Sequence, residues 1–341
     1  MIKKKNLKKI VYIGNNLSEG NPTTIQQLSI ALAGAGFHML VFSNKKNRII
    51  RLLDMCWGVL KNYKASYILI DTYSTNNFYY AFIISQLARV FQIKYIPILH
   101  GGNLPQRLQK NPFLAACIFK NSVINVSPSH YLLEVFSKAG FPTMVIPNAI
   151  AIDAYAVTER TTFAPKVLWV RAFDKIYNPT MAVAVLVELK KSFPNATLCM
   201  VGPDKDGSLQ EVMEFAKFKN VAAAIEFTGG LSKEDWIQKS KNYDIFINTS
   251  NFDNMPVSVI EAMALGLPVI STNVGGISYL IADGNTGKLV AKNNAVEMAE
   301  VIRSILENPL EGLNIAKNAR KQVELFDERE VLKMWLKVVQ K

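Results

Sequence analysis

The segment from Asn248 to Gly276 holds the residues of this chain whose types and spacing could do chemistry. It contains two carboxylates, Asp253 and Glu261, with seven residues between them. The pattern predicts a short buried strand, a polar loop with Asp253, a helix opened by Asn254-Met-Pro with Glu261, and a second strand. A helix N-terminus beside a strand end favours phosphate, because its free N–H groups and its dipole attract anions. Carboxylates there can accept hydrogen bonds from hydroxyl groups, so the segment is typical of a site for a nucleotide-linked sugar.

A cation follows another strand-like run in the same half of the chain. Arg171 ends the run Val-Leu-Trp-Val. Ligands of open parallel sheets bind at the carboxyl ends of strands, and a guanidinium binds phosphate through two parallel hydrogen bonds while keeping its charge. We therefore expect Arg171 to contact a phosphate group, the alternative being a surface arginine in a loop.

Strand-like and helix-like segments alternate along the chain, which favours parallel sheets with helices on both faces. Two doubly wound units, joined near residues 150–165, are expected. Helices are expected at Thr24–Gly34, Phe78–Phe91 and roughly Leu313–Lys341. The expected strands are Lys9–Gly14, Met39–Phe42, Tyr67–Asp71, Tyr95–Leu99, Ser122–Val126, Met144–Pro147, Val167–Val170, Ala196–Val201, Ala224–Phe227, Ile245–Asn248 and Val269–Thr272.

Composition and cysteine use indicate a cytoplasmic protein. The 341 residues, half of them hydrophobic, are enough for two domains with a core each. The cysteines Cys56, Cys117 and Cys199 are scattered without a CxxC pair, which suits buried thiols in a reducing compartment. No apolar run reaches the ~18 residues of a transmembrane helix. The first residues lack the apolar core of a signal peptide.

The net charge of +12 belongs to the first half of the chain. Residues 1–150 contain 17 Lys and Arg against 4 Asp and Glu, whereas residues 151–341 contain 22 against 23. Such a surface attracts an anionic membrane, a phosphorylated acceptor or nucleic acid, or it serves solubility alone. No nucleic-acid-binding motif is present, so we expect peripheral contact with the inner face of the plasma membrane. Two basic stretches, Asn47–Lys64 and Leu104–Lys120, fit either an interfacial helix or an ordinary core-facing helix.

At these residues the chain resembles the retaining glycosyltransferases of family 4, which have the GT-B fold. The family carries two acids with seven residues between them, a small-residue helix turn, Gly-x-Pro, a strand and Gly-Gly. The first acid is usually Glu, and this chain has Asp. The matching residues are Asp253, Glu261-Ala-Met-Ala, Gly266-Leu-Pro268 and Gly275-Gly276, with further matches at Pro147-Asn148-Ala149, Leu168–Arg171 with Lys175, Met200–Pro203 and Phe227–Gly229.

The resemblance implies two Rossmann-like domains that face each other across a cleft. Residues 1–150 would bind the acceptor, residues 151–320 the nucleotide sugar, and residues 321–341 would cross back to the first domain, with Phe326 and Trp335 in this last part. A sugar would pass with retention from a nucleotide sugar to the hydroxyl of a sugar or a lipid-linked acceptor.

The resemblance also assigns residues to the donor. Arg171 and Lys175 would hold the diphosphate and offset the charge that develops as it leaves. Glu261 would contact the ribose hydroxyls, unless it is an exposed helix residue. Asp253 would contact the transferred sugar, and a helix N-cap is the alternative or additional role. The remaining donor-binding residues would be Gly202, Asn254, Met255, Val257 and Ser258.

On the first domain the family carries a histidine that faces the donor sugar, and His100 matches its place. A structural histidine is the alternative. Gly101, Gly102, Asn103 and Gly20 would lie on the acceptor side, where glycines allow a ligand to approach the backbone. The dinucleotide fingerprint GxGxxG is absent.

We expect no metal and no other cofactor, because the two cations Arg171 and Lys175 can supply the charge. The expected role is a hexosyl or related transfer in cell-surface polysaccharide or lipopolysaccharide synthesis. Two alternatives stay open. A sugar-nucleotide epimerase of the same fold would convert the donor without an acceptor, and a non-catalytic scaffold partner would bind the nucleotide sugar without turnover.

Overall fold

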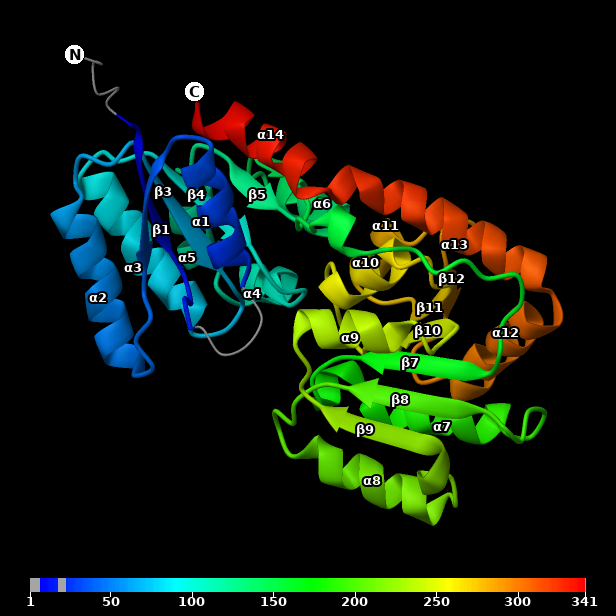
Figure 1. Ribbon diagram of the computed structural model, residues 1–341. Helices are drawn as coiled ribbons and strands as arrows, with labels where there is room; N and C mark the ends of the chain where they lie inside the picture. Colours follow the sequence, from blue (N-terminus) through cyan, green and yellow to red (C-terminus); the bar gives the residue numbers. More distant parts are fainter. Residues whose placement is uncertain (1–6, 18–22, 341) are drawn as a thin grey trace. The chain divides into compact units, whose positions relative to one another are not determined.

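The computed structural model describes residues 7–17 and 23–340, and they form two compact units (Figure 1). The first unit comprises Met1–Ala149 with Glu328–Lys341, and the second comprises Ile150–Asp327. Gly20 lies outside the described residues. None of the described helices is long and apolar enough to cross a membrane.

The first unit is built on a six-stranded sheet in the order β2-β1-β3-β4-β5-β6, in which every neighbouring pair is parallel. The order reverses between β1 and β3, which is where ligands of such sheets bind. The strands are β1 Lys9–Ile13, β2 His38–Phe42, β3 Tyr67–Thr72, β4 Tyr95–Leu99, β5 Asn125–Ser127 and β6 Thr143–Val145. The helices are α1 Thr24–Gly34, α2 Arg48–Lys61, α3 Asn77–Val90, α4 Leu104–Lys110, α5 Pro112–Phe119, α6 His130–Lys138 and α14 Glu328–Val339.

The second unit repeats this plan with the order β12-β11-β10-β7-β8-β9, again parallel throughout. Its order reverses between β7 and β10. The strands are β7 Lys166–Val170, β8 Thr197–Val201, β9 Ile225–Gly229, β10 Ile245–Asn248, β11 Val269–Thr272 and β12 Lys288–Val290. The helices are α7 Pro179–Leu189, α8 Ser208–Phe218, α9 Lys233–Ser240, α10 Val257–Ala264, α11 Ile277–Leu280, α12 Ala295–Glu307 and α13 Pro309–Val323, with short 3-10 turns η1 Ile152–Ala154, η2 Lys175–Tyr177, η3 Ala222–Ala224 and η4 Glu324–Phe326.

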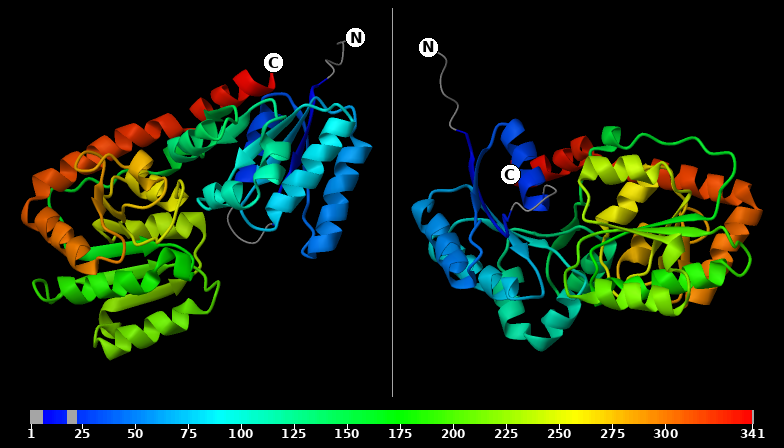
Figure 2. Two further views of the ribbon diagram at one scale, coloured as in Figure 1. Left: turned by 180° about the vertical axis from the view of Figure 1, so that it is seen from behind. Right: turned by 60° about the horizontal axis from the view of Figure 1, so that its bottom comes forward.

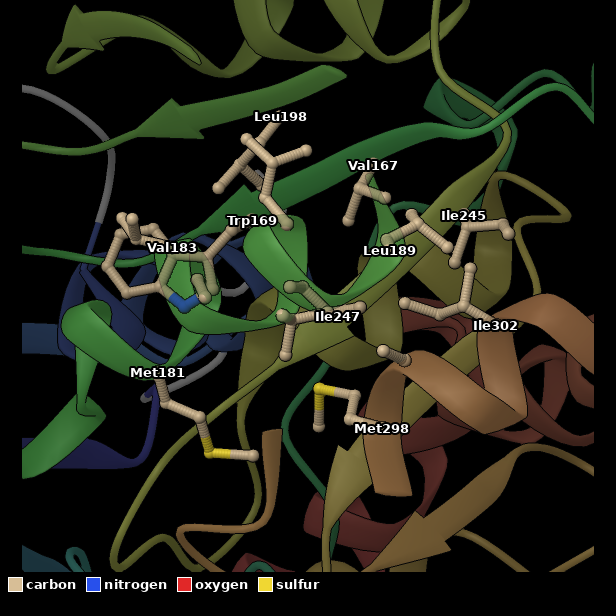
Figure 3. Packing of buried hydrophobic residues seen from close by; sticks show 14 of the residues in the cluster. Val167, Trp169, Met181, Val183, Leu189, Leu198, Ile245, Ile247, Met298 and Ile302 are labelled. Carbon is tan, nitrogen blue, oxygen red and sulfur yellow. The ribbon is translucent and has the colours of Figure 1, made fainter. Parts of the chain in front are cut away.

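Each sheet has an apolar core on both faces, because successive side chains of a strand point to opposite sides. In β7, Val167 and Trp169 join the cluster beneath α7, α8 and α12, whereas Leu168 joins the cluster beneath α10 and α13. Figure 3 shows Trp169, fully buried, with Met181 and other members of the first cluster around it. The expectation of doubly wound units with helices on both faces is confirmed.

Several element boundaries differ from those expected. The stretch Leu104–Lys120 is two helices, because Pro112 cannot continue α4 and begins α5 instead. The strand expected at Ser122–Val126 is Asn125–Ser127, since Ser122 turns back to bond Asn125 through its hydroxyl group. The three-residue strand β12 was not expected.

The single helix expected at Leu313–Lys341 is wrong. Asp327 adopts an extended conformation with ψ 139° between η4 and α14, and its neighbour Phe326 accepts a hydrogen bond from the Ile150 N–H at 2.9 Å. Phe326 packs in the second unit, whereas Trp335 of α14 packs in the first. Helix α14 lies beside α1 (Figure 2). The chain therefore leaves the second unit at an irregular junction.

Candidate functional site

The candidate site of the second unit lies where its strand order reverses. Arg171 directly follows β7, and the loop Thr249–Pro256 follows β10, which is the neighbour of β7 in the sheet. The carboxyl ends of these parallel strands meet at one edge, so Arg171 and Asp253 come together although 82 residues separate them.

Arg171 and Asp253 form an ion pair, in which a guanidinium Nη atom donates to Asp253 Oδ2. Both side chains are mostly buried, and the guanidinium lies 4.4 Å over the ring of Tyr177. Burial lowers the pKa of Arg171, but from so high a value that it keeps its charge. Asp253 also accepts the Asn254 N–H at 2.9 Å. Asp253 is not the N-cap of α10, because Pro256 holds that position.

Glu261 is buried in α10 and paired. Its Oε1 atom accepts a hydrogen bond from the Tyr155 hydroxyl at 2.5 Å and lies 3.2 Å from Lys233 Nζ. Burial and the Glu261 charge raise the pKa of Tyr155, so the phenol stays protonated and donates. The alternative of an exposed helix glutamate is wrong. Both partners use Oε1, and Oε2 of the same carboxylate can accept from a ligand.

Two polar atoms at this edge have no hydrogen-bond partner among the residues that the structure describes, although both are buried. They are Arg171 Nε and the hydroxyl oxygen of Ser258, in the first turn of α10. Buried polar atoms are almost always paired in proteins, so these two atoms are candidate hydrogen-bond donors to a ligand. The first N–H groups of the helix, at Val257 and Ser258, have no acceptor within the helix, because no helical turn precedes them.

Glycines fix the backbone around this edge. A Cβ atom on Gly275 would lie 2.0 Å from the Asp253 carbonyl oxygen, and one on Gly276 would lie 2.1 Å from that of Asn254. The Gly-Gly turn after β11 therefore lets the Asp253 loop pack directly against it.

Replacing Gly202 by alanine should destabilise the second unit by about 3 kcal/mol. Gly202 follows β8 with φ 155°, and an added Cβ atom would lie 1.8 Å from the Arg171 carbonyl oxygen. Gly207→Ala is the matched control, because Gly207 has φ 84° but open space around it, and it should cost about 1 kcal/mol. Urea unfolding of both variants measures the difference, and equal losses would contradict the close approach.

The side chain of Lys175 pairs with an acid of α8. Lys175 lies in η2, its side chain is mostly exposed, and its Nζ atom is 2.8 Å from Glu211 of α8. The hydrogen bond that Lys175 donates to Glu211 raises the pKa of Lys175. Of the two cations expected at a diphosphate, the structure brings only Arg171 to Asp253.

The first unit has its own polar cluster at the end of β1, β3 and β4. His100 Nε2 lies 2.9 Å from Asp71 Oδ1, which also accepts the Tyr12 hydroxyl at 2.9 Å, and the ring of Tyr73 stacks on His100 at 4.8 Å. Gly14 allows this packing, because a Cβ atom there would lie 2.3 Å from Asp71 Oδ2.

Burial raises the pKa of Tyr12 and of Tyr73, and the Asp71 carboxylate raises both further. Both phenols therefore stay protonated. Gly101, with φ 80°, and Gly102 and Asn103 follow His100 and lead into α4. The cluster holds the imidazole of His100 in one orientation at the carboxyl edge of the sheet.

Sequence reasoning missed four of these residues, Asp71, Tyr12, Tyr155 and Lys233. Asp71 carried a usable signal, because a carboxylate at the end of an expected buried strand is costly without partners. Tyr155 and Lys233 carried none, since each reaches its partner only through the tertiary fold.

Comparison with known proteins shows which family this part of the chain resembles. Residues 156–322 match the family model described as glycosyl transferases group 1. Over these residues the second unit is similar to the glycosyl transferases group 1 family. The match covers Arg171, Asp253 and Glu261 and ends within α13.

Similar proteins match only part of the chain. Glycogen synthase of Mycobacterium tuberculosis is 25% identical over 202 residues, which are 58% of this chain and 48% of that protein. The chain thus spans about half the length of that relative. An N,N'-diacetylbacillosaminyl-diphospho-undecaprenol alpha-1,3-N-acetylgalactosaminyltransferase of Campylobacter jejuni is 30% identical over 117 residues, 34% of this chain and 31% of that one.

Solved structures match nearly the whole chain in fold. Sucrose-phosphate synthase of Thermosynechococcus elongatus superposes with a TM-score of 0.82 at 19% identity, covering 98% of both chains. Anabaena HepE in complex with UDP gives 0.77 at 17% identity, covering 97% of this chain and 99% of that one. The expected α/β fold of the GT-B class is confirmed.

Proposed function

We propose that this protein transfers a sugar from a nucleotide-sugar donor to an acceptor hydroxyl, with retention at the anomeric carbon. One observation carries the proposal: the carboxyl edge of the second sheet holds a buried Arg171–Asp253 pair and a buried Glu261. A cation suits a diphosphate, and two carboxylates suit the hydroxyls of ribose and sugar.

The nucleotide sugar would bind to the atoms of this edge that have no hydrogen-bond partner. Arg171 holds Asp253 through Nη, and its Nε atom would donate to a phosphate oxygen. The first N–H groups of α10 and the Ser258 hydroxyl would bind the diphosphate as well. Glu261 would accept from the ribose hydroxyls through Oε2, held in place by Tyr155 and Lys233.

In the reaction, the bond from the anomeric carbon to the phosphate oxygen breaks as the acceptor oxygen bonds that carbon on the same face. The acceptor proton passes to the departing phosphate oxygen. Arg171 would offset the negative charge that develops there, which is electrostatic stabilisation of the transition state. Asp253 would orient the sugar hydroxyls, and Lys175 could contribute after leaving Glu211. Because a protein cation supplies the charge, we propose that no metal is needed.

The names of two similar proteins support the choice of substrates. Anabaena HepE binds UDP, and the Campylobacter relative is named for an acceptor linked to diphospho-undecaprenol. They favour a nucleoside diphosphate sugar as donor and a sugar or lipid-linked acceptor. We propose a cytoplasmic role in cell-surface polysaccharide or lipopolysaccharide synthesis.

A thermal-shift panel of UDP, GDP, ADP, CMP and their sugar conjugates tests the donor site. A nucleotide at a hundred times its dissociation constant should add about 2.7 kcal/mol of stability. The shift should appear with one base and vanish in Glu261→Ala. Glu300→Ala removes an exposed glutamate of α12 and should leave the shift unchanged.

Each outcome of the panel has a consequence. No shift with any nucleotide would refute the donor site. A shift that Glu261→Ala retains would refute the role of Glu261. Binding of a nucleotide sugar without turnover, across a set of acceptors, would favour the non-catalytic scaffold alternative.

A further inference from the structure

The outward face of α2 carries an apolar stripe. Five large apolar side chains of this helix are between 41% and 72% exposed, namely Ile49, Ile50, Leu53, Trp57 and Leu60. Residues of an α-helix are about 100° apart, so these five fall within an arc of about 100°. The opposite face, with Met55 and Val59, is buried in the core of the first unit beside α3 (Figure 1). A surface helix ordinarily presents polar side chains to water, and α2 presents apolar ones.

Cations border the stripe at both ends of the helix. Lys45 and Arg48 lie at its start and Lys61 and Lys64 at its end, and all four are exposed. Arg51 holds the basic loop against the first turn, since its Nε atom donates to the Lys45 carbonyl oxygen at 2.7 Å. Across residues 38–64 a single acid, Asp54, accompanies six Lys and Arg. The chemistry of this face is apolar in the middle and positive at the rim.

We propose that α2 docks the first unit on the surface of an anionic lipid bilayer. The stripe would enter the headgroup region and the bordering cations would contact lipid phosphates, as interfacial helices with Trp and Lys do. Charge complementarity selects this partner, because the first half of the chain carries 17 Lys and Arg against 4 acids. Such docking is a property of the first unit that goes beyond the transfer reaction.

The other basic stretch does not share these properties. All residues of Leu104–Lys120 are described, and its two helices bury Leu104, Ile118 and Phe119 in the core. Phe113 alone of its large apolar side chains is mostly exposed. This stretch therefore forms ordinary core-facing helices. We assign the docking role to α2.

Trp57 gives a direct readout of docking in the intact protein. Of the four tryptophans, Trp57 is 61% exposed, whereas Trp169, Trp236 and Trp335 are at most 4% exposed. Vesicles of phosphatidylcholine with phosphatidylglycerol should shift the emission of Trp57 to shorter wavelength and protect it from an aqueous quencher. Co-sedimentation with the same vesicles should weaken as salt is raised, and vesicles of phosphatidylcholine alone should bind less.

An apolar pair of variants tests the stripe. Ile49→Ser with Leu53→Ser should lower affinity for the anionic vesicles at least tenfold. Phe218→Ser with Leu310→Ser is the matched control, because these side chains of the second unit are 76% and 72% exposed. The control should bind vesicles as the wild type does. Equal binding by both double variants would overturn the proposal.

A charge pair tests the rim. Lys61→Glu with Lys64→Glu should weaken binding to the anionic vesicles at least tenfold, since each surface cation contributes about fivefold. Binding to phosphatidylcholine alone should change little. An unchanged affinity for anionic vesicles would overturn the role of the cations.

Two further outcomes separate docking on lipid from self-association of the protein. Absence of wild-type binding to anionic vesicles would overturn the proposal. A wild-type dimer that Ile49→Ser with Leu53→Ser converts to monomer, with Trp57 protected before lipid is added, would assign the stripe to a second copy instead. The nucleotide shift, measured on the same samples, reports the donor site separately, so failure of one assignment leaves the other standing.

Discussion

Replacing Arg171 by alanine should lower kcat/KM about a thousandfold while the protein stays folded. The guanidinium lies buried at the edge of the second sheet, and we propose that it faces the charge that develops on the departing diphosphate. Fixed donors in such sites contribute about a hundredfold to a thousandfold each, and the loss also leaves Asp253 without its buried counter-ion. Steady-state kinetics with the donor identified by the nucleotide panel measures the effect.

Two companion variants give this prediction its controls. Arg171→Lys keeps the charge but loses the planar fork, so we expect an intermediate loss of about tenfold to a hundredfold. Arg303→Ala removes a half-exposed arginine of α12 and should leave kcat/KM within about twofold. If Arg171→Ala keeps more than a tenth of the wild-type activity, the proposed diphosphate contact is wrong.

Replacing His100 by alanine should lower kcat about a hundredfold or more without changing nucleotide affinity. We propose that the imidazole, held by Asp71, acts on the transferred sugar, whereas the proposed nucleotide contacts belong to the second unit. The thermal shift with the nucleotide alone should therefore remain within about twofold of wild type in dissociation constant. Kinetics and binding together separate a lost catalytic contact from a lost site.

Two variants in the same unit complete this test. His130→Ala removes an exposed histidine at the start of α6 and should leave kcat unchanged. Asp71→Asn keeps the shape of the side chain and changes the hydrogen bonds that orient His100, so we expect about a tenfold loss of kcat. A His100→Ala variant with wild-type kcat would reassign His100 as a structural residue.

The local part of the candidate site could be predicted from the sequence. Arg171 and Asp253 follow strands, and Glu261 lies within a helix. The apolar runs of these elements are plain, and the carboxyl edge of a parallel sheet then brings the three residues together. The strands Ile245–Asn248 and Val269–Thr272 on both sides of the carboxylates have the bounds expected, because buried strands read as continuous apolar runs.

The features that could not be predicted from the sequence depend on contacts between distant segments. Glu261 receives its hydrogen bond from Tyr155, 106 residues away, in a segment without periodicity. The helix break at Asp327 leaves no trace in the apolar pattern, since Phe326 and Trp335 both suit a helix face. It arises because the chain there bonds Ile150, which no local rule anticipates. The partner of Lys175 could not be predicted, because an exposed lysine side chain can pair with any nearby acid. In the structure that acid is Glu211.

The junction at Ile150 and Phe326 also sets the order in which the chain can fold during synthesis. All six strands of the first unit precede residue 150 and are therefore made before the second unit. Helix α14, which covers one face of their sheet with Trp335, is made after the second unit. At about 5–20 residues per second, translation of Ile150–Asp327 takes roughly 10–35 s. During that time the apolar face around Tyr12, Leu69 and Ile96 lacks the part of its cover that α14 supplies, so we expect the nascent chain to expose apolar surface that a chaperone can bind.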